Sequence, residues 1–266
     1  MIDKRLSFQD AFQLIPSGGM LGLGGMTNYR RPVAFCKELV RHYQNTGEPN
    51  KLTLLAFTAG FESDLLVGTR MVDAIRSCYF GLEIFGLAPM FTYYANRGEI
   101  QVIEETEASI ALGLRATLGG IGFLPARAWI GTDLLRLRPD VKTIEDPYTG
   151  EKLVAFPAIK PDLAVIHAIK ADIEGNALIG DNKAVDEELT LAAEKVIVTA
   201  EEIVDKLDQA DLVTQFVDGV IHAPLGAQPT SCHPLYRIDG DALLDYVENV
   251  NDPPSFEKYL ADNIKF

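Results

Sequence analysis

Apolar runs of strand length alternate with helix-like segments along most of this chain. The runs occupy residues 20–23, 52–56, 75–80, 101–104, 152–156, 163–169, 196–198 and 219–222. Segments with apolar residues at every third or fourth position lie between them, at 33–43, 106–118 and 187–194. This alternation predicts an α/β fold with a mainly parallel, open sheet flanked by helices. We expect a single domain over residues 1–266, with a helical tail from about residue 241 that is interrupted at 252–254.

The composition limits the classes of partner and compartment. With 47% hydrophobic and 23% charged residues among 266, the chain is typical of globular proteins. A net charge of −14 argues against nucleic acid or an anionic membrane as the main partner. No apolar run reaches membrane-spanning length, and the first residues show no signal-peptide pattern. The three widely spaced cysteines form no disulfide or metal-binding pattern, so we expect a cytoplasmic protein.

Four loops are expected to lie together beyond one edge of the sheet. Ligands of open α/β sheets bind beyond the carboxyl ends of the parallel strands. The loops that follow the first four predicted strands are 24–31, 58–62, 81–86 and 104–107. Candidate functional residues are therefore sought in these loops.

The first of these loops is rich in glycine and joins a short apolar run to a helix. Gly24 and Gly25 open it, and Pro32 fits the first turn of the helix, where a missing N–H costs nothing. Bare backbone N–H groups beside a helix N-terminus stabilise a phosphate or a developing oxyanion, and Arg30 and Arg31 add charged donors. The same glycines also fit an ordinary turn. The loop matches neither the dinucleotide-binding pattern nor the P-loop pattern.

An acidic cluster of Glu104, Glu105 and Glu107 follows the fourth predicted strand, where the next helix begins. Thr106 is a candidate cap for that helix. A carboxylate in the first helical turn is stabilised by the helix dipole, so Glu107 has a structural explanation. The functional alternative is a general base or nucleophile at the carboxyl edge of the sheet, and Glu107 is the candidate catalytic residue.

The histidines and cysteines show no metal-binding spacing, so we expect no metal site. His167 and His222 lie within apolar strands and are expected in the core. The sequence Ser-Cys-His at 231–233 does not predict a catalytic triad, because triad members meet through the fold rather than as neighbours in sequence. Trp129 is expected to pack in an apolar interior, and residues 172–176 are expected to form a turn.

Several motifs resemble the alpha subunits of the family I coenzyme A transferases, above all those of glutaconate CoA-transferase type. The glycine loop resembles theirs, except that Met26 stands where they usually have phenylalanine. Further matching motifs follow in the same order: F-L-P at 123–125, G-T-D at 131–133, E-G-N at 174–176 and D-G-V-I-H-A-P-L-G-A at 218–227. The resemblance covers roughly residues 7 to 237, and it implies the fold shared by CoA transferases and certain sugar-phosphate isomerases.

The resemblance implies an enzyme subunit that helps to move coenzyme A between carboxylic acids. The nucleophilic glutamate, which carries CoA as a thioester, would belong to a beta subunit in an α2β2 complex. This chain would bind the CoA ester and its oxyanion through the glycine loop. The residues concerned are Gly24, Gly25, Met26, Thr27, Asn28 and Arg30. No cofactor is expected to be bound permanently, because the CoA thioester is a substrate.

Two alternatives stay open. A related branch consists of hydrolases that open a steroid ring of a CoA ester, and their alpha subunits resemble this chain too. In that branch a glutamate after the fourth strand takes part in the chemistry, and Glu107 is the position that matches it best. The same fold also occurs in non-catalytic proteins that bind sugar phosphates or acyl-CoA.

Overall fold

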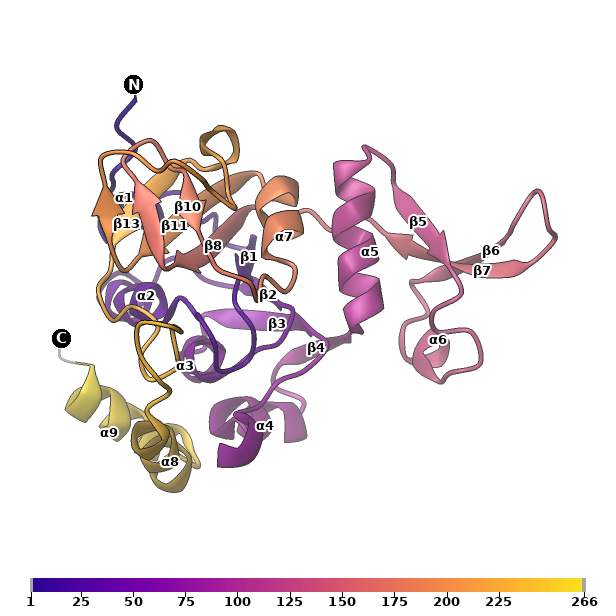
Figure 1. Ribbon diagram of the computed structural model, residues 1–266. Coiled ribbons are helices and arrows are strands. Elements are labelled where there is room, and N and C mark those ends of the chain that lie inside the picture. Colours follow the sequence, from indigo (N-terminus) through magenta and orange to yellow (C-terminus); the bar gives the residue numbers. More distant parts are fainter. Residues whose placement is uncertain (1, 265–266) are drawn as a thin grey trace.

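Seven strands form one parallel sheet in the computed structural model, which describes residues 2–264 (Figure 1). The strand order is β13-β11-β8-β1-β2-β3-β4. The strands are β1 (Met20–Leu23), β2 (Leu52–Ala56), β3 (Val72–Ser77), β4 (Gln101–Glu104), β8 (Leu163–Ala168), β11 (Lys195–Ala200) and β13 (Gly219–His222). The predicted α/β fold with a mainly parallel sheet is confirmed.

Helices cover both faces of this sheet. One face is packed by α1 (Phe8–Phe12), α2 (Val33–Thr46), α3 (Phe61–Gly68), α4 (Pro89–Asn96), α8 (Gly240–Asn249) and α9 (Pro253–Asn263). The other face is packed by α5 (Glu107–Leu118) and α7 (Asp186–Ala192). Successive strand residues point to opposite faces, so Leu163 and Val165 enter the first core while Ala164 and Ile166 enter the second. Burial on both faces explains why such strands are nearly all apolar.

A small antiparallel unit projects beyond α5, away from the main sheet (Figure 1). It contains β5 (Phe123–Ala126), β6 (Lys142–Glu145) and β7 (Lys152–Pro157) in the order β5-β7-β6, together with the short helix α6 (Leu134–Leu137). Its core includes Trp129 and Phe156, whose rings meet edge to face with their centroids 5.1 Å apart. Trp129 therefore packs in an apolar interior, as expected.

A second small sheet follows β8 in the chain and contains β9 (Lys170–Asp172), β10 (Ala177–Leu178) and β12 (Ile203–Val204). The buried carboxylate of Asp172 accepts the backbone N–H groups of Glu174 and Asn176 at 3.1 and 2.9 Å, which closes the predicted turn at 172–176. Two short 3-10 helices complete the secondary structure, η1 (Glu83–Phe85) and η2 (Thr214–Phe216).

The tail contains the two predicted helices, α8 and α9. Asp252 caps α9 by accepting the backbone N–H of Ser255 at 2.9 Å, and Pro253 is the first residue of that helix. Phe256 packs so closely on α3 that a Cβ added to Gly68 would lie 2.3 Å from its ring. The tail is thus part of the core on one face of the main sheet. Across residues 2–264, no helix is both long and apolar enough to cross a membrane.

Two expectations about strands of the main sheet are wrong. The third strand is Val72–Ser77 rather than 75–80. The exposed Asp73 interrupts the apolar run near the start of the strand, and Phe80 belongs to the loop that follows. His222 is the last residue of the edge strand β13 and is exposed rather than buried in the core.

Candidate active site

The four candidate loops lie side by side at the carboxyl edge, because β1, β2, β3 and β4 are successive neighbours in the parallel sheet. Hydrogen bonds join the first three of these loops to one another. The N–H of Thr27 donates to the hydroxyl of Thr58 at 2.7 Å, and the N–H of Ala59 donates to the carbonyl of Tyr79 at 2.8 Å. The predicted convergence of the loops is confirmed, although the third loop already begins at Cys78, directly after β3.

The glycine loop, residues 24–31, lies where the order of the strands reverses. The chain proceeds from β1 outward to β4 on one side and from β8 outward to β13 on the other, which opens a crevice between the loops after β1 and β8. A cavity of about 430 Å³ lies here, and its lining includes Tyr29, Ile169, Asn182 and His233. The sequence does not show Asn182 and His233 to be part of this site, since only the three-dimensional strand order brings them beside the glycine loop.

Three residues of the glycine loop have left-handed backbone conformations, namely Gly25 (φ 81°), Thr27 (φ 46°) and Arg30 (φ 54°). Glycine is required at position 25, because a Cβ would lie 2.4 Å from the carbonyl oxygen of Arg30. For a β-branched residue such as Thr27, a positive φ is a strained conformation. Such strain persists only where surrounding contacts maintain it, and it is common at functional sites. Pro32 is the N-cap of α2 rather than its first residue.

Most backbone N–H groups of the glycine loop are already hydrogen-bonded within the protein. Those bonded to backbone or hydroxyl oxygens belong to Gly24, Met26, Thr27, Tyr29 and Arg30. The N–H of Gly25 donates to both carboxylate oxygens of Asp186, at 3.0 Å each. The N–H of the half-buried Asn28 makes no hydrogen bond to any of residues 2–264. Asn28 therefore offers a free donor, whereas Gly25 does not.

The two arginines of the glycine loop do not form the expected basic patch. Arg30 and Arg31 are both 0% exposed. The guanidinium of Arg30 pairs with Asp186 at 2.6 Å, and that of Arg31 pairs with Glu62 at 2.7 Å. This corrects the expectation that Arg30 faces a bound CoA ester, since both charges are neutralised inside the protein. The sequence showed the two cations but not their burial or their partners.

Glu107 is the first residue of α5 and is exposed at the carboxyl edge. Thr106 caps the helix as predicted, by accepting the N–H of Ser109 at 3.2 Å, so the cap does not require Glu107. In the part of the chain that the structure describes, the Glu107 carboxylate makes no hydrogen bond or ion pair. Burial, with a contribution from the nearby Glu107 carboxylate, raises the pKa of the Cys78 thiol to about 12. Cys78 is therefore a neutral thiol, and Glu107 is an unpaired acid close to it.

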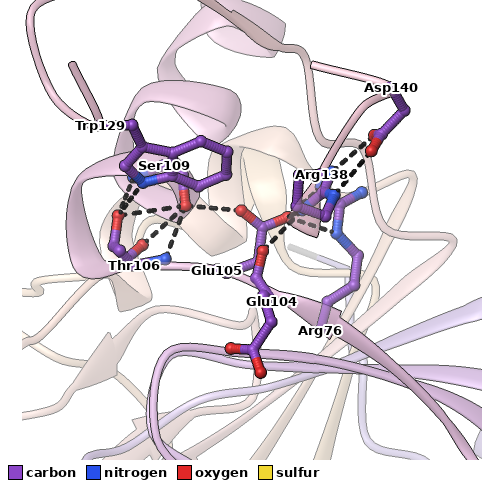
Figure 2. A network of polar contacts seen from close by, with 8 residues as sticks. All are labelled: Arg76, Glu104, Glu105, Thr106, Ser109, Trp129, Arg138 and Asp140. Carbon is purple, nitrogen blue, oxygen red and sulfur yellow. Dashed lines mark hydrogen bonds and ion pairs between the residues drawn. The ribbon is translucent and has the colours of Figure 1, made fainter. Parts of the chain in front are cut away.

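A network of buried charges holds the end of β4 against the antiparallel unit (Figure 2). Glu105 is 5% exposed and accepts hydrogen bonds of 3.0 Å from Arg76 of β3 and from Arg138 of the antiparallel unit. Arg138 also donates to the backbone carbonyl of Glu104 at 2.7 Å. The indole N–H of Trp129 donates to the capping threonine of α5 at 2.9 Å. The antiparallel unit thus fixes residues 104–106, while the side chain of Glu104 points away from the network (Figure 2).

Next to the glycine loop, the side-chain ligand atoms of His167, Glu201 and Cys232 lie within 4.8 Å of one another. His167 Nε2 and Glu201 are hydrogen-bonded at 2.8 Å, and Glu201 also accepts the N–H groups of Leu225 and Gly226. Burial lowers the pKa of His167 and raises that of Cys232 to about 12, so both side chains are neutral. The oxygens of Glu201 are used by the protein, and the cluster supports the chain at 225–226.

The pattern that defines the coenzyme A transferases matches residues 5–222 of this chain. The chain belongs to the coenzyme A transferase family. This CoA transferase assignment agrees with the resemblance of the sequence motifs, and it favours an enzyme subunit over a non-catalytic binding protein of the same fold. The matched region contains the whole parallel sheet, and only the tail helices α8 and α9 lie outside its range among the main helices.

Relatives of this CoA transferase chain are named for different reactions. It is 32% identical, over 98% of its length, to an uncharacterized protein of Archaeoglobus fulgidus, of which it spans 60%. It is 30% identical, over 98% of its length, to one subunit of the 3-oxoadipate CoA-transferase of Pseudomonas knackmussii and covers 93% of it. It is 31% identical, over 97% of its length, to the cholesterol ring-cleaving hydrolase IpdA subunit of Rhodococcus jostii and covers 91% of it. Sequence identity alone therefore does not separate a transferase from a hydrolase.

Two solved structures have the same fold. Glutaconate coenzyme A-transferase from Acidaminococcus fermentans matches with a TM-score of 0.89 and 28% identity, covering 98% of this chain and 88% of that one. A decarboxylase, AibA/AibB, matches with a TM-score of 0.87 and 30% identity, covering 98% of this chain and 100% of that one. Subunits of this architecture thus take part in more than one reaction.

Proposed function

We propose that this chain is the alpha subunit of a heteromeric CoA transferase that moves CoA between carboxylic acids. The partner is a beta subunit in an α2β2 complex, and the complex works in the cytoplasm. The substrates are an acyl-CoA thioester and a free carboxylate, and no cofactor is bound permanently. The transferases among the similar proteins, named for 3-oxoadipate and glutaconate, support this class of reaction.

The glycine loop carries this proposal. The N–H of Asn28 is a free donor in that loop, and a donor of this kind stabilises the oxyanion formed when a thioester carbonyl is attacked. The N-terminus of α3 lies beside it, because a Cβ at Gly60, the N-cap of α3, would lie 2.8 Å from the carbonyl oxygen of Thr27. Glu62 in the first turn of α3 is 0% exposed and paired with Arg31, so it is not available as a nucleophile. These features support a nucleophilic carboxylate that comes from the partner.

In the proposed reaction, a glutamate carboxylate of the partner attacks the thioester carbonyl carbon and CoA leaves as a thiolate, which produces an acyl–glutamyl anhydride. The thiolate then attacks the glutamyl carbonyl carbon, the first acid leaves as a carboxylate, and CoA stays on the glutamate as a thioester. The acceptor carboxylate passes through the same two steps in reverse and takes the CoA. Each attack develops negative charge on a carbonyl oxygen, which the N–H of Asn28 would stabilise.

Acceptor dependence in the reconstituted complex tests this proposal. The co-purified complex of this chain with the beta subunit is supplied with an acyl-CoA, with and without a carboxylic acid acceptor. We expect a new CoA ester only when the acceptor is present, no turnover by the single chain, and a mass increase on the partner that corresponds to bound CoA. Turnover by this chain alone, or repeated consumption of the CoA ester without any acceptor, beyond the single turnover that loads CoA onto the partner, would contradict the proposal.

A second function, cleavage of a carbon–carbon bond in a cyclic CoA ester, is favoured by one observation. Glu107 is an exposed acid at the carboxyl edge and has no partner within residues 2–264. A catalytic base needs such an available carboxylate. The similarity to the ring-cleaving hydrolase subunit of Rhodococcus jostii supports this alternative. Acceptor-independent consumption of a cyclic CoA ester that is lost in Glu107→Gln would identify it.

A further inference from the structure

Charged side chains hold both polar groups of Gly25. Its N–H donates to the carboxylate of Asp186, at 3.0 Å to each oxygen, and its carbonyl accepts a hydrogen bond of 2.8 Å from the guanidinium of Arg31. Asp186 is 1% exposed and Arg31 is 0% exposed. Because both side chains are buried, turning either peptide unit of Gly25 would take one hydrogen bond from a buried charge.

Two buried ion pairs extend this arrangement in opposite directions. Asp186, at the start of α7, pairs with Arg30 at 2.6 Å, and Arg30 also donates to the carbonyl of His167 in β8 at 2.6 Å. Glu62, in the first turn of α3, pairs with Arg31 at 2.7 Å. The glycine loop is therefore tied to β8 and α7 on one side and to α3 on the other. The side of β8 borders the crevice where the strand order reverses, and the side of α3 lies beyond the glycine loop.

The glycine loop needs such support because its backbone is strained. Thr27 and Arg30 have positive φ angles of 46° and 54°, which non-glycine residues rarely adopt. Strained residues of this kind keep their conformation only where neighbouring contacts over-determine it. Buried ion pairs add little net stability, so four buried charges around a single glycine call for another explanation.

We propose that Asp186 and Glu62 are positioning residues that keep the glycine loop in the conformation that presents the N–H of Asn28. Both carboxylates are buried and act through the loop: Asp186 holds the Gly25 N–H and Arg30, and Glu62 acts through Arg31. The inference rests on the proposed use of this loop for the thioester oxygen. Displacement of a positioned group by about 1 Å is enough to lower a rate by about 10².

Conservative substitutions test the two carboxylates. Asp186→Asn keeps the shape of the side chain but directs an amide NH₂ at the Gly25 N–H or at the Arg30 guanidinium, which are both donors, so one hydrogen bond is lost. Glu62→Gln changes the support on the other side by removing a charge. Oε2 of Glu62 has no hydrogen-bond partner among the described residues, so the amide NH₂ takes its place and the other oxygen still accepts from Arg31, but Arg31 is left buried without a counter-charge. The second variant provides the test if the first does not fold.

Asp172→Asn is the matched control. Asp172 is equally buried, at 0% exposed, and it also accepts backbone N–H groups, but it lies in the turn after β9 and bonds to Glu174 and Asn176. A stability loss without an effect on the glycine loop is therefore expected for this variant. Two measurements are made on all three variants: hydrogen–deuterium exchange of residues 24–31 in the isolated full chain, and kcat and KM of the complex with the beta subunit.

For Asp186→Asn and Glu62→Gln we expect exchange in residues 24–31 to be at least ~10-fold faster, and kcat to fall by ~10–100-fold while KM for the acyl-CoA changes by less than ~3-fold. Asp172→Asn should leave exchange in the glycine loop and kcat unchanged. If the first two variants lose thermal stability as the control does but retain normal loop exchange and kcat, the positioning role is refuted. If the wild-type complex has no acyl-CoA activity, the proposed function is refuted. If exchange in residues 24–31 is then still faster in the two variants, the conclusion that Asp186 and Glu62 fix the conformation of the glycine loop is still supported.

Discussion

The hydroxyl of Tyr246 on α8 donates a hydrogen bond of 2.7 Å to the carboxylate of Asp64 on α3. Asp64 also accepts the backbone N–H groups of Met90 and Phe91, at 3.1 and 2.6 Å, and so caps α4, which has no capping side chain of its own. Both Asp64 and Tyr246 are 0% exposed. One buried carboxylate thus joins the tail to two helices that pack on the main sheet.

The acidity of Asp64 makes the stability of the fold depend on pH. Burial raises the pKa of this carboxyl from 3.8 to about 6. The folded protein then binds the proton more tightly than the unfolded chain, so the stabilising contribution is complete below pH 3.8 and is lost as the pH rises to about 6. We expect the free energy of unfolding of the wild type, relative to Asp64→Asn, to fall by on the order of 3 kcal/mol across this range and then to stay level. Urea unfolding at a series of pH values measures it, and parallel profiles for the two proteins would contradict it.

Tyr246→Phe isolates the hydrogen bond to this carboxylate. At pH 7 its loss should lower the free energy of unfolding by about 1.5–3 kcal/mol, the range for hydrogen bonds to charged groups. Because this bond lowers the pKa of Asp64, the pH-dependent fall in stability should also extend to higher pH. Tyr259→Phe is the control, since its ring packs on Tyr246 with centroids 4.8 Å apart but its hydroxyl does not bond to Asp64. Equal losses in the two variants would show that the effect comes from removing a tyrosine hydroxyl in general and not from the hydrogen bond to Asp64.

The elements of the main sheet could be predicted because they depend on local periodicity. The strands Leu52–Ala56, Gln101–Glu104 and Gly219–His222 have the expected bounds, and the loops after the first four strands converge as expected. Runs of apolar residues indicate strands that are buried on one or both faces. Such runs can be recognised from consecutive residues alone. The error at the third strand arose where the exposed Asp73 interrupted such a run.

The partners within the candidate site could not be predicted in the same way. Asp186 lies 161 positions from Gly25 in the sequence, and only the pairing of β1 with β8 brings α7 next to the glycine loop. The sequence favours anion binding by Arg30 and Arg31, because it does not show whether a cation is buried against a distant acid. The network around Glu105 could not be predicted for the same reason, since Arg138 belongs to the separate antiparallel unit.

Gly25→Ala and Gly47→Ala separate backbone strain from steric exclusion. Both glycines have left-handed conformations, with φ of 81° and 74°, so an alanine at either costs roughly 1–2 kcal/mol. A Cβ at Gly47 would meet no atom within 4 Å, whereas one at Gly25 would lie 2.4 Å from the carbonyl oxygen of Arg30. We expect Gly47→Ala to keep normal activity in the complex, and Gly25→Ala to lose about 10²-fold or more in turnover through displacement of the glycine loop. Near-normal turnover of Gly25→Ala would show that the glycine loop is an ordinary turn with no role in catalysis.

The buried and the exposed ion pairs of the antiparallel unit should contribute unequally to stability. Arg138→Met takes one of two cations from the buried Glu105, which keeps Arg76 and the Ser109 hydroxyl, and removes the donor to the carbonyl of Glu104. We therefore expect a loss of about 3–5 kcal/mol. Arg127→Met is the control in the same unit, because its ion pair with Glu151 is exposed and should contribute less than about 1 kcal/mol. Urea unfolding of the two variants measures the loss in the free energy of unfolding for each. Similar small losses would show that the buried network does not hold the antiparallel unit to the main sheet.

Glu107→Gln separates the transferase from the hydrolase. If the nucleophile belongs to the partner, Glu107 only adds a charge at the N-terminus of α5, and its loss should cost less than about 1 kcal/mol and leave the chemistry intact. If Glu107 is the base of a ring-cleaving hydrolase, the same change should lower the rate by about 10²–10⁴. The complex is given an acyl-CoA with and without an acceptor acid, and the release of free CoA and the formation of a new ester are followed together.

Glu104→Gln is the control for the removal of one negative charge at this edge. Glu104 is also exposed, and its side chain points away from the network that fixes the end of β4 (Figure 2). Acceptor-dependent transfer that survives both substitutions excludes the hydrolase. Acceptor-independent consumption of a CoA ester that is lost in Glu107→Gln but kept in Glu104→Gln excludes the transferase, because only a positioned base would distinguish two exposed carboxylates three residues apart.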